Sequence, residues 1–474
     1  MKSNMHKNIV AGFILTILSI TGCTVPNFKG WTRDADTPDV EWVIDWKAEE
    51  VPVAMTVSMY DSNDTMSVRA CPVKFDSKGN LWVLSDSIMK FTPDGEKISE
   101  ISWSGPGGNS AITPMDMALD SKDNIFILGL SGKTPDFDPG PGVVTENPSG
   151  GQNTTSLVKL DPDGNYIWGH SWLGSEFCNI GKGGYSVCCD NADNCYISSQ
   201  YMGDVGTTEE GHGSYIAKFN PDGSEKWRFK WEPFPWNIIA GNDGLYVVGQ
   251  TSGKVDFDPG KEDAYIDVIT AGFVTEFTSD GEYDGTRIFT GSGMAPVINS
   301  IALDSKGNLL IGGAEMIDPT KGWDNQRYWG VLYKMTPDGK DIWVKRWGGG
   351  QCGCIVTCIS VDDKDNIFAG GTLSFGAYEQ QTGNTDLDPS DNIDNHFIHQ
   401  DDIFLSKFDS DGNFQWSGTW GNENTDWVRS IANDKNGGIY LLGSFDGSVD
   451  FDPGPGKSIV KGTGLEAFLL KLQE

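Results

Sequence analysis

Four segments of the sequence place two aspartates at positions i and i+2 and follow them with proline. Carboxylates at this spacing can point the same way, and the turn behind them can bring backbone carbonyls round, as hard cations such as Ca²⁺ require. The alternative interpretation is a packed apolar residue before an aspartate-capped turn, because the terminal bidentate glutamate of a full Ca²⁺ loop is missing. The candidate calcium ligands are Asp136, Asp138, Asp256, Asp258, Asp386, Asp388, Asp450 and Asp452.

Two other clusters contain residue types that bind metals. Cys352, Cys354 and Cys358 lie close together, but structural zinc sites normally show two ligand pairs and this chain has only this cluster. The second cluster lies in an expected loop insertion and consists of His396, His399, Asp401 and Asp402. Its histidines are three positions apart in a segment without a predicted helix, which makes it a weak metal motif.

Motifs for covalent catalysis are missing from the sequence. No serine lies in a nucleophile-elbow pattern, no phosphate-binding glycine loop follows an expected strand, and no metalloprotease helix is visible. Carboxylates are abundant, so an acid/base pair for glycan cleavage stays open. We therefore assign no catalytic residue from the sequence.

The composition limits the possible partners. The chain has 35 Lys and Arg against 67 Asp and Glu, a formal net charge of −32 over 474 residues. Such a chain repels polyanions, so nucleic acid is excluded as an expected partner, whereas cations, neutral glycans and proteins remain possible. The 60 glycines and 17 tryptophans favour turns and pleated strands over helices.

The N-terminal segment has the features of an export signal. Lys2 and Lys7 precede an apolar run over residues 9–20, which is too short for a spanning helix. The run ends in Ile20-Thr21-Gly22-Cys23, which resembles the bacterial lipobox, in which the cysteine is acylated. This resemblance implies a signal peptide over 1–22, a lipid (palmitate) anchor on Cys23 and a tether over 23–40. Because Thr24 is not aspartate, it also implies the outer membrane, with the protein facing the periplasm or the outside.

Eight further cysteines would enter an oxidising compartment after export, and an even number there is consistent with disulfides. Cys188 and Cys195 flank an Asp-rich turn, so we expect them to face each other across a hairpin. The sequence thus predicts a Cys188–Cys195 bridge as the best single candidate.

Two turn signatures alternate along the chain and indicate repeated supersecondary units. An Asp-rich turn occurs seven times, for example Asp76 to Asn80 and Asp304 to Asn308. A hairpin turn of the type Pro93-Asp94-Gly95 occurs six times. Proline, aspartate and glycine in succession favour a tight turn. We interpret the aspartates of the first signature as hairpin chemistry on a solvated surface.

Each repeat contains four expected strands, and the fourth carries paired tryptophans such as Trp227 and Trp231. Rings four residues apart face the same side of a strand, so we expect them to pack between sheets, with sugar stacking as the alternative. The last repeat lacks its fourth strand, and the segment 41–46 supplies one. We therefore predict an all-β, closed seven-bladed β-propeller over residues 41–474, whose N-terminal strand completes the last blade.

Nearly all insertions fall between the second and third strands or between blades, including residues 131–156, 251–272 and 372–403. These connections lie on one face of a propeller, and long loops on a rigid scaffold usually carry binding. We name it the loop face and call the opposite one the turn face. A protein or glycan ligand is expected on the loop face.

The alternating turns and the Gly-x-Val-Asp-Phe-Asp-Pro-Gly loops at residues 253–260 and 447–454 resemble the bacterial seven-bladed β-propeller repeat (SBBP) proteins. They are more distantly similar to NHL-type propellers. The resemblance covers residues 41–474 and implies an exported or surface protein. It supplies no catalytic residue, because members mostly have no assigned reaction.

Two functions of different classes follow. The favoured one is a non-catalytic, lipid-anchored binding or scaffold propeller at the cell envelope. The alternative is a propeller enzyme, a metal-assisted lyase or hydrolase acting on polysaccharide. An enzyme would need convergent titratable side chains in the axial funnel, whereas a binding protein would not.

Overall fold

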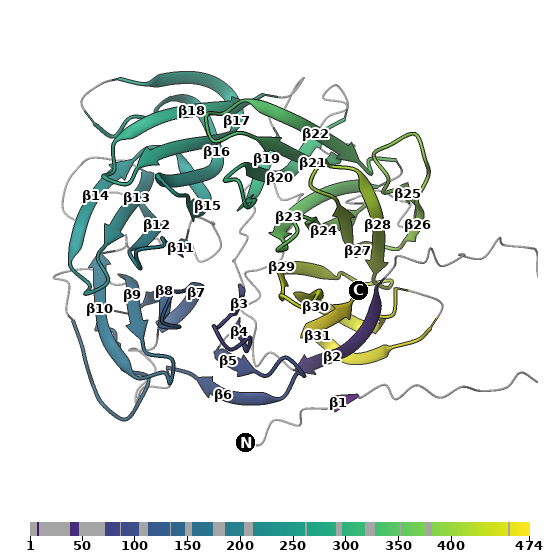
Figure 1. The fold of residues 1–474 in the computed structure, drawn as a ribbon, viewed down its shortest axis with the longest axis horizontal. Coiled ribbons are helices and arrows are strands. Elements are labelled where there is room, and N and C mark those ends of the chain that lie inside the picture. Colours follow the sequence, from purple (N-terminus) through teal and green to yellow (C-terminus); the bar gives the residue numbers. More distant parts are fainter. Residues whose placement is uncertain are drawn as a thin grey trace, which may run out of the picture.

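The computed structural model describes residues 7–8, 38–46, 72–85, 87–103, 112–132, 134–146, 154–173, 185–202, 212–260, 263–290, 296–317, 328–350, 352–375, 382–453 and 456–474. These residues form strands and turns without any helix. Seven antiparallel sheets are arranged around a central axis, which is the predicted β-propeller (Figure 1).

Each blade runs from an innermost to an outermost strand. Blade 1 contains β3 (Val73–Phe75), β4 (Leu81–Leu84), β5 (Ile88–Phe91) and β6 (Lys97–Ile101). Blade 2 contains β7 (Ile112–Leu119), β8 (Ile125–Ser131), β9 (Thr154–Leu160) and β10 (Tyr166–Leu173). Blade 3 contains β11 (Ser186–Cys189), β12 (Cys195–Met202), β13 (His212–Phe219) and β14 (Glu225–Trp231). Blade 4 contains β15 (Phe234–Ala240), β16 (Gly244–Asp256), β17 (Tyr265–Thr278) and β18 (Tyr283–Phe289).

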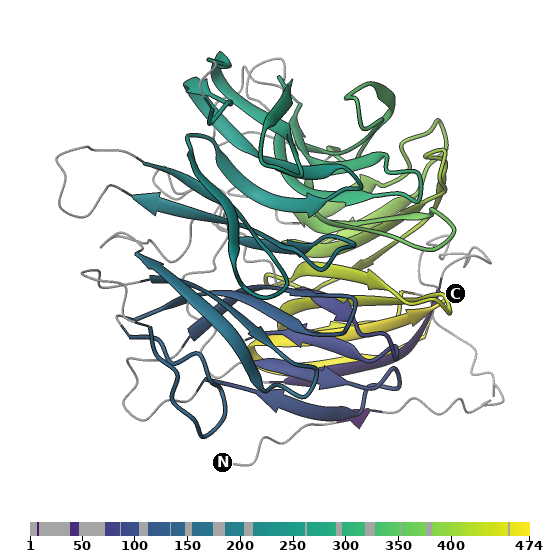
Figure 2. The ribbon, with the colours of Figure 1, turned by 60° about the vertical axis from the view of Figure 1, so that its left-hand side comes forward.

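The remaining blades follow the same order. Blade 5 contains β19 (Val297–Leu303), β20 (Leu309–Met316), β21 (Tyr328–Met335) and β22 (Asp341–Trp347). Blade 6 contains β23 (Gly353–Val361), β24 (Ile367–Ser374), β27 (Asp401–Phe408) and β28 (Phe414–Trp420), with a separate hairpin of β25 (Gly383–Asp386) and β26 (Asn395–Ile398). Blade 7 contains β29 (Trp427–Asn433), β30 (Gly438–Asp450), β31 (Ile459–Gln473) and β2 (Asp39–Trp46). Figure 2 shows the twist of these sheets from the side.

The N-terminal strand closes the ring as predicted. β2 pairs antiparallel with β31, from Asp39 opposite Gln473 to Trp46 opposite Ala467. It begins two residues before the predicted start of the propeller at residue 41. A short β1 (Lys7–Asn8), inside the predicted signal peptide, pairs with β2. Cys23 and residues 23–37 of the predicted tether lie outside the described residues.

The Asp-rich turns are local hydrogen-bonded units. In blade 2, Oδ1 of Asp120 accepts the backbone N–H groups of Lys122 and Asn124, both at 2.9 Å, and Oδ2 accepts the Asn124 side-chain amide at 2.8 Å. This geometry explains why Asp and Asn stand four positions apart in the repeat.

The first aspartate is buried in three of these turns (Asp76, Asp120 and Asp304), whereas the next two residues are exposed, so our interpretation of the turns as solvated surface holds only in part. Lys159, on β9, places its Nζ 2.9 Å from Oδ2 of Asp120 and 3.2 Å from the carbonyl oxygen of Pro221 in blade 3. Burial acts to raise the pKa of Asp120, but the hydrogen bonds from Asn124 and Lys159 outweigh it, so the pKa lies below its usual value. We call this arrangement the lysine latch. Lys218 and Lys334 form equivalent latches, in which they pair with Asp190 and Asp304 and reach the next blade. Lys471 likewise reaches the carbonyl oxygen of Pro93 in blade 1, but it pairs with Glu41.

The tryptophans of the fourth strands pack between blades, as predicted. The indole N–H of Trp227 donates to the carbonyl oxygen of Ser279 in blade 4 at 3.2 Å. Gly281 follows in that turn with φ of 85°, and a Cβ there would lie 2.8 Å from the Trp227 ring. Glycine is therefore required both for its positive φ and for the close approach of the ring.

Candidate functional site

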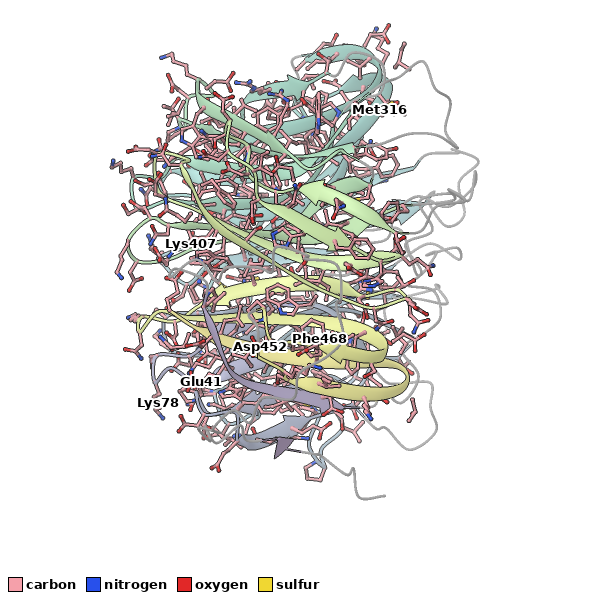
Figure 3. All side chains as sticks on the ribbon, turned by 90° about the vertical axis from the view of Figure 1, so that its right-hand side faces the viewer. Glu41, Lys78, Met316, Lys407, Asp452 and Phe468 are labelled. Atoms are coloured by element: carbon pink, nitrogen blue, oxygen red, sulfur yellow. The ribbon has the colours of Figure 1, made fainter. Side chains whose placement is uncertain are left out.

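The two faces of the propeller differ in their connections, as predicted. In the edge-on view of Figure 3, Lys78, on an Asp-rich turn, lies at one face and Met316, at the end of β20, at the other. Part of the predicted loop insertions is strand, because β16 and β17 continue outward together as far as Asp256 and Tyr265, and β30 and β31 as far as Asp450 and Ile459. We call the segments that carry the acidic motif in blades 2, 4, 6 and 7 the loop-face projections.

The aspartates of the motif close the tips of these projections. In blade 4, Oδ1 of Asp256 accepts the backbone N–H groups of Asp258 at 3.1 Å and Ala264 at 2.9 Å. Oδ1 of Asp258 accepts the N–H of Gly260 at 2.7 Å. The first aspartates of the other copies bond to backbone N–H groups two and eight positions ahead in the same way: Asp136, Asp386 and Asp450.

The apolar residue between the two aspartates anchors each tip. Phe257 is fully buried, and its carbonyl oxygen accepts the indole N–H of Trp231 at 2.9 Å. The carbonyl oxygen of Phe451 likewise accepts the indole N–H of Trp420 at 2.8 Å. Phe137 and Leu387 are buried as well. All four tips are therefore fixed to the blades by packing, and those of blades 4 and 7 also by a tryptophan on the fourth strand of the preceding blade.

These contacts bear on the calcium hypothesis. One oxygen of each aspartate in the blade 4 loop is already used in closing the turn, and Ca²⁺ takes six to eight oxygen ligands. The chemistry of the donors fits a hard cation, but much of its ligand shell would have to be water. Across the described ranges, no three His, Cys, Asp or Glu side chains are grouped to hold a metal ion. Calcium binding at the eight aspartates stays a prediction.

Apolar side chains protrude from the same projections. Val143 is 72% exposed in blade 2, Ile269 is 91% exposed in blade 4 and Ile393 is 73% exposed in blade 6. Phe397, on β26, is also exposed. Because their backbones are held by the buried anchors, these side chains are presented to solvent on ordered segments.

The two histidines of the candidate metal cluster have separate environments. His396 is almost fully buried, and its Nε2 lies 2.8 Å from Oγ of Ser417 and 3.1 Å from Oδ2 of Asp394. Both partners meet the same ring nitrogen, so this is not the arrangement of a catalytic triad, in which the acid and the serine use opposite nitrogens. His399 is more exposed, and its backbone N–H donates to Asp402. The network fixes β26 against β28.

Buried carboxyl groups meet at the seam between blades 6 and 7. Burial raises the pKa of Asp402 to about 6, against the opposing effect of His399. Burial, with the nearby Asp402 and Asp446, raises the pKa of Asp426 to about 7, although it accepts the backbone N–H groups of Asn422 and Asp446. Asp426 is 0% exposed, so this group is closed to a substrate.

The predicted Cys188–Cys195 disulfide is wrong. Cys195 pairs with Cys189 in the β11–β12 register, whereas Cys188 pairs with Tyr196. Cys188 packs towards blade 4, and Cys195 packs with Cys189 towards blade 2. The described thiols of all three are free. The error comes from the turn, which spans Asp190 to Asn194 and leaves Cys189 as the residue opposite Cys195.

The other cysteine cluster does not converge either. Cys352 and Cys354 belong to the core of blade 6 that faces blade 5, while Cys358 packs towards blade 7. Burial raises the pKa of Cys358 to about 12 and that of Cys354 well above its usual value. Neutral thiols on opposite sides of a sheet are structural rather than metal-binding.

One carboxyl group on an innermost strand has a strongly raised pKa. Burial raises the pKa of Asp116, on β7, to about 6, partly offset by Lys74 and by hydrogen bonds. Its Oδ2 accepts the N–H of Val187 in blade 3 at 2.7 Å and its Oδ1 that of Met117 at 2.8 Å. Asp116 therefore ties two blades together, and the enzyme alternative gains no support from it.

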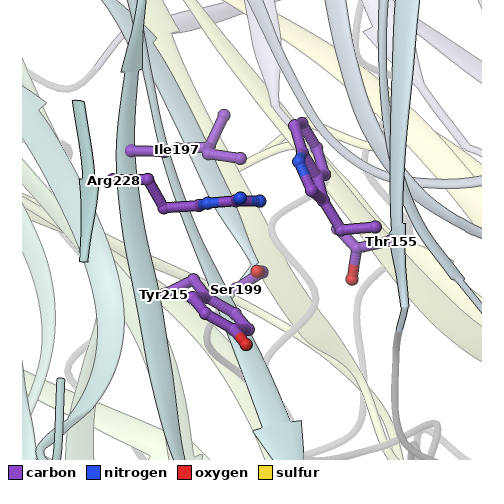
Figure 4. Close-up of a pocket in the computed structure, with 7 residues that line it drawn as sticks. Thr155, Ile197, Ser199, Tyr215 and Arg228 are labelled. Atoms are coloured by element: carbon purple, nitrogen blue, oxygen red, sulfur yellow. The ribbon is translucent and has the colours of Figure 1, made fainter. Parts of the chain in front are cut away.

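A crevice between blades 2 and 3 is a site that the sequence analysis missed. It is small, with an internal volume of about 10 Å³, and is lined by Thr155, Trp172, Ile197, Ser199, Tyr215, Ala217 and Arg228. Figure 4 shows the Arg228 side chain reaching into the space between Ile197, Tyr215 and Thr155. The sequence feature that could have indicated this crevice is β14, in which the basic residues Lys226, Arg228 and Lys230 alternate with aromatic residues in a strongly acidic chain.

Comparison with known proteins gives likeness only to solved structures. No protein-family model and no curated protein sequence matches the chain. Streptogramin B lyase matches with 11% identity and a TM-score of 0.42 over 86% of this chain and 95% of the other. BamB from Moraxella catarrhalis matches with 8% identity and a TM-score of 0.37 over 86% and 98%. A gluconolactonase from Xanthomonas campestris matches with 11% identity and a TM-score of 0.34 over 93% and 96%.

The described segments include no helix that is long and apolar enough to cross a bilayer.

Proposed function

We propose that this protein is an exported, lipid-anchored propeller of the SBBP type that binds a protein or glycan at the cell envelope and has a scaffold role rather than a catalytic one. The observation that carries the proposal is the set of loop-face projections, which present Val143, Ile269 and Ile393 to solvent on anchored backbones. Side chains exposed on ordered loops of a rigid scaffold are available for contact with a partner.

The position of the N-terminal strand supports a lipid anchor on the far side from the ligand. β2 starts at Asp39 opposite Gln473, next to the Asp-rich turns, and runs towards the loop face. A tether from Cys23 would therefore join the propeller at its turn face. The loop face would then point away from the membrane, where a partner can reach it.

The chemistry of the projections favours a protein partner with a basic and apolar surface. Each projection combines two motif aspartates with an apolar residue near its tip, such as Val143 or Ile393. Aspartates close to exposed apolar groups attract a basic surface during encounter, and the apolar contacts then slow dissociation.

The loop-face test compares two triple variants in envelope cross-linking. Val143→Asp, Ile269→Asp and Ile393→Asp are combined in the first, and Ile98→Asp, Ile167→Asp and Ile342→Asp in the control, whose sites lie near the turn face and are also exposed. We expect defined cross-linked species with the wild type and the control, and at least a tenfold loss with the first variant. Equal cross-linking of both variants would refute the assignment to the loop face.

The anchor test is separate. Cys23→Ala is expected to abolish incorporation of labelled palmitate and to release the protein from the membrane fraction, while leaving its thermal unfolding unchanged. Continued labelling of this variant would contradict acylation at Cys23.

A further inference from the structure

Two cysteines face each other across the innermost hairpin of blade 3. Cys189, the last residue of β11, is the register partner of Cys195, the first residue of β12. Directly opposite residues of an antiparallel pair have their side chains on the same side of the sheet. Both cysteines accordingly pack in the core between blades 2 and 3, whereas Cys188 packs on the other side of the sheet. The two thiols therefore share one space.

The type of register pair sets the separation of the two backbones. Asp190 donates its backbone N–H to the carbonyl oxygen of Asn194 at 3.0 Å, so these residues form a hydrogen-bonded pair. Hydrogen-bonded and non-hydrogen-bonded pairs alternate along an antiparallel ladder, which makes Cys189 and Cys195 a non-hydrogen-bonded pair. The Cα atoms of such a pair are about 4.5 Å apart, within the range of about 4.4–6.8 Å that disulfides span.

The two thiols are already in contact in the reduced form. Both are free in the structure, and a hydrogen bond joins the thiol of Cys195 to that of Cys189. Burial raises the pKa of Cys195 well above its usual value, and this hydrogen bond raises it further. Cys195 is 0% exposed, whereas Cys189 is partly exposed. The pair thus has one sulfur that an oxidant can reach and a second one held against it.

The other blades place different residues at these two positions. On the second strand, all six have a buried leucine or isoleucine: Leu81, Ile125, Leu245, Leu309, Ile367 and Ile439. On the first strand, five have an apolar residue and blade 7 has Asn433. Only blade 3 has cysteine at both positions. Two small thiols fill this part of a core less well than larger apolar side chains, so packing alone does not explain the pair.

We propose that Cys189 and Cys195 form a cross-strand disulfide in the exported protein, which covalently closes the innermost hairpin of blade 3. The inference rests on the export that is part of the proposed function, because a reducing compartment would keep both thiols. β11 has only four residues, so a covalent link at its end supplements a short ladder.

The oxidant is the disulfide of a thiol–disulfide oxidoreductase. The thiolate of Cys189 attacks this disulfide, forms a mixed disulfide and releases one oxidant sulfur as a thiolate. The thiolate of Cys195 then attacks the sulfur of Cys189 and releases the second oxidant sulfur. One S–S bond forms in the protein and one breaks in the oxidant. The two protein thiols lose two electrons and two protons, which the oxidant takes up as it becomes a dithiol.

The test uses purified full-length protein equilibrated with oxidised or with reduced glutathione, so that its result does not depend on export. A protease that cleaves before aspartate separates the two cysteines, because Asp190 and Asp193 lie between them. Non-reducing mass spectrometry then detects any link. With oxidised glutathione we expect the linked peptides to be at least about tenfold more abundant than the same peptides unlinked, and with reduced glutathione we expect the link to be lost. Unlinked, alkylated Cys195 in oxidised glutathione would overturn the proposal.

Two variants identify the partner of Cys195, since Cys188 and Cys189 remain on one peptide. Cys189→Ala should lose the link. Cys188→Ala is the matched control and should keep it, because its side chain lies on the opposite side of the sheet. A link that persists in Cys189→Ala and disappears in Cys188→Ala would refute the assignment. The fall in unfolding temperature on adding reductant should also be smaller in Cys189→Ala than in Cys188→Ala.

The same peptides, mapped from cells, separate this inference from the proposed function. Incorporation of labelled palmitate reports export and anchoring independently of the hairpin. Palmitate-labelled protein with free Cys189 and Cys195 would overturn the disulfide and leave the proposed function standing. An unlabelled chain that is reduced in cells, but forms the link in oxidised glutathione, would overturn the proposed export and with it the disulfide in the cell.

Discussion

At the scale of single residues, the aspartates of the acidic motif act first as acceptors for their own loops. The carboxylate of Asp256 holds two backbone N–H groups, one of them eight positions ahead, and thereby fixes the size of the loop. Sequence alone left this interpretation open beside calcium binding, because both use the same residue types. The hydrogen bonds support loop closure, and unfolding with and without Ca²⁺ separates loop closure from calcium binding.

Asp256→Ala should destabilise the protein by about 2 kcal/mol, because two backbone donors lose a charged acceptor. The measurement is urea unfolding with excess chelator and again with millimolar Ca²⁺. We expect the same loss in both conditions if the loops close without a cation. A wild-type midpoint that rises with Ca²⁺, and fails to rise in a variant with all four first aspartates replaced, would instead establish the calcium sites.

Asp116 makes the free energy of unfolding depend on pH, and the direction of its pKa shift sets the sign of this dependence. Its folded pKa of about 6 lies above its unfolded value, so the folded protein binds more protons between these values. Its contribution to stability is therefore present at low pH and is lost as the pH rises through about 4 to 6. We expect a fall on the order of 2 kcal/mol between pH 4 and pH 7 from this group.

The check on Asp116 is unfolding of the wild type and of Asp116→Asn across that range. The asparagine side chain has the same shape and does not ionise. The variant should therefore lack the part of the fall in stability that Asp116 causes between pH 4 and pH 7. A parallel pH dependence in both proteins would show that Asp116 titrates at its ordinary pKa.

At the scale of elements, the repeats are held to one another by side chains at the turn face. Besides the lysine latch, Ser77 and Ser121 in the Asp-rich turns bond to Asp123 and Asp193 in the turn of the next blade, at 2.6–3.0 Å. Asp123 and Asp193 have a φ of 63°, a conformation that favours glycine. The hydrogen bonds from the serine of the preceding blade offset the conformational free-energy cost of this positive φ. They explain why aspartate occurs at those positions.

Lys159→Met should destabilise the protein by about 3 kcal/mol, because it leaves the buried carboxylate of Asp120 without its cation. The double variant Lys159→Met with Asp120→Asn should lose less than the sum of the two single losses, measured in a thermal or urea double-mutant cycle. Lys340→Met is the control, since its ion pair with Asp338 is exposed and should change stability little. Strict additivity would contradict the latch.

At the scale of the whole molecule, stability depends on the closure of the ring by β2. A chain without residues 1–46 would expose the long edge of β31, and free edges associate with one another. We expect it to aggregate or to unfold at a clearly lower temperature by light scattering and calorimetry. A chain without residues 1–37 keeps β2 and serves as the control. A monomeric 1–46 deletion with the wild-type unfolding temperature would show that closure is dispensable.

The sequence by itself determined the number of blades, the order of their strands and the closing role of the N-terminal strand. It could do so because the Asp-rich turns and hairpins depend on contacts within a few positions, such as those of Asp120 with Lys122 and Asn124. The paired tryptophans were likewise readable, since strand periodicity fixes which side their rings face.

Only the tertiary structure decided which residues meet across blades. Lys159 and Pro221 are 62 positions apart, and Arg228 meets Trp172 in a crevice that neither blade forms alone. The hairpin register that pairs Cys195 with Cys189 rather than Cys188 also required the exact ends of one turn. Radial packing fixes such contacts, and no local pattern encodes how two neighbouring sheets will face each other. For that reason the sequence revealed the scaffold and its acidic loops, while the crevice between blades 2 and 3 became visible only between assembled blades.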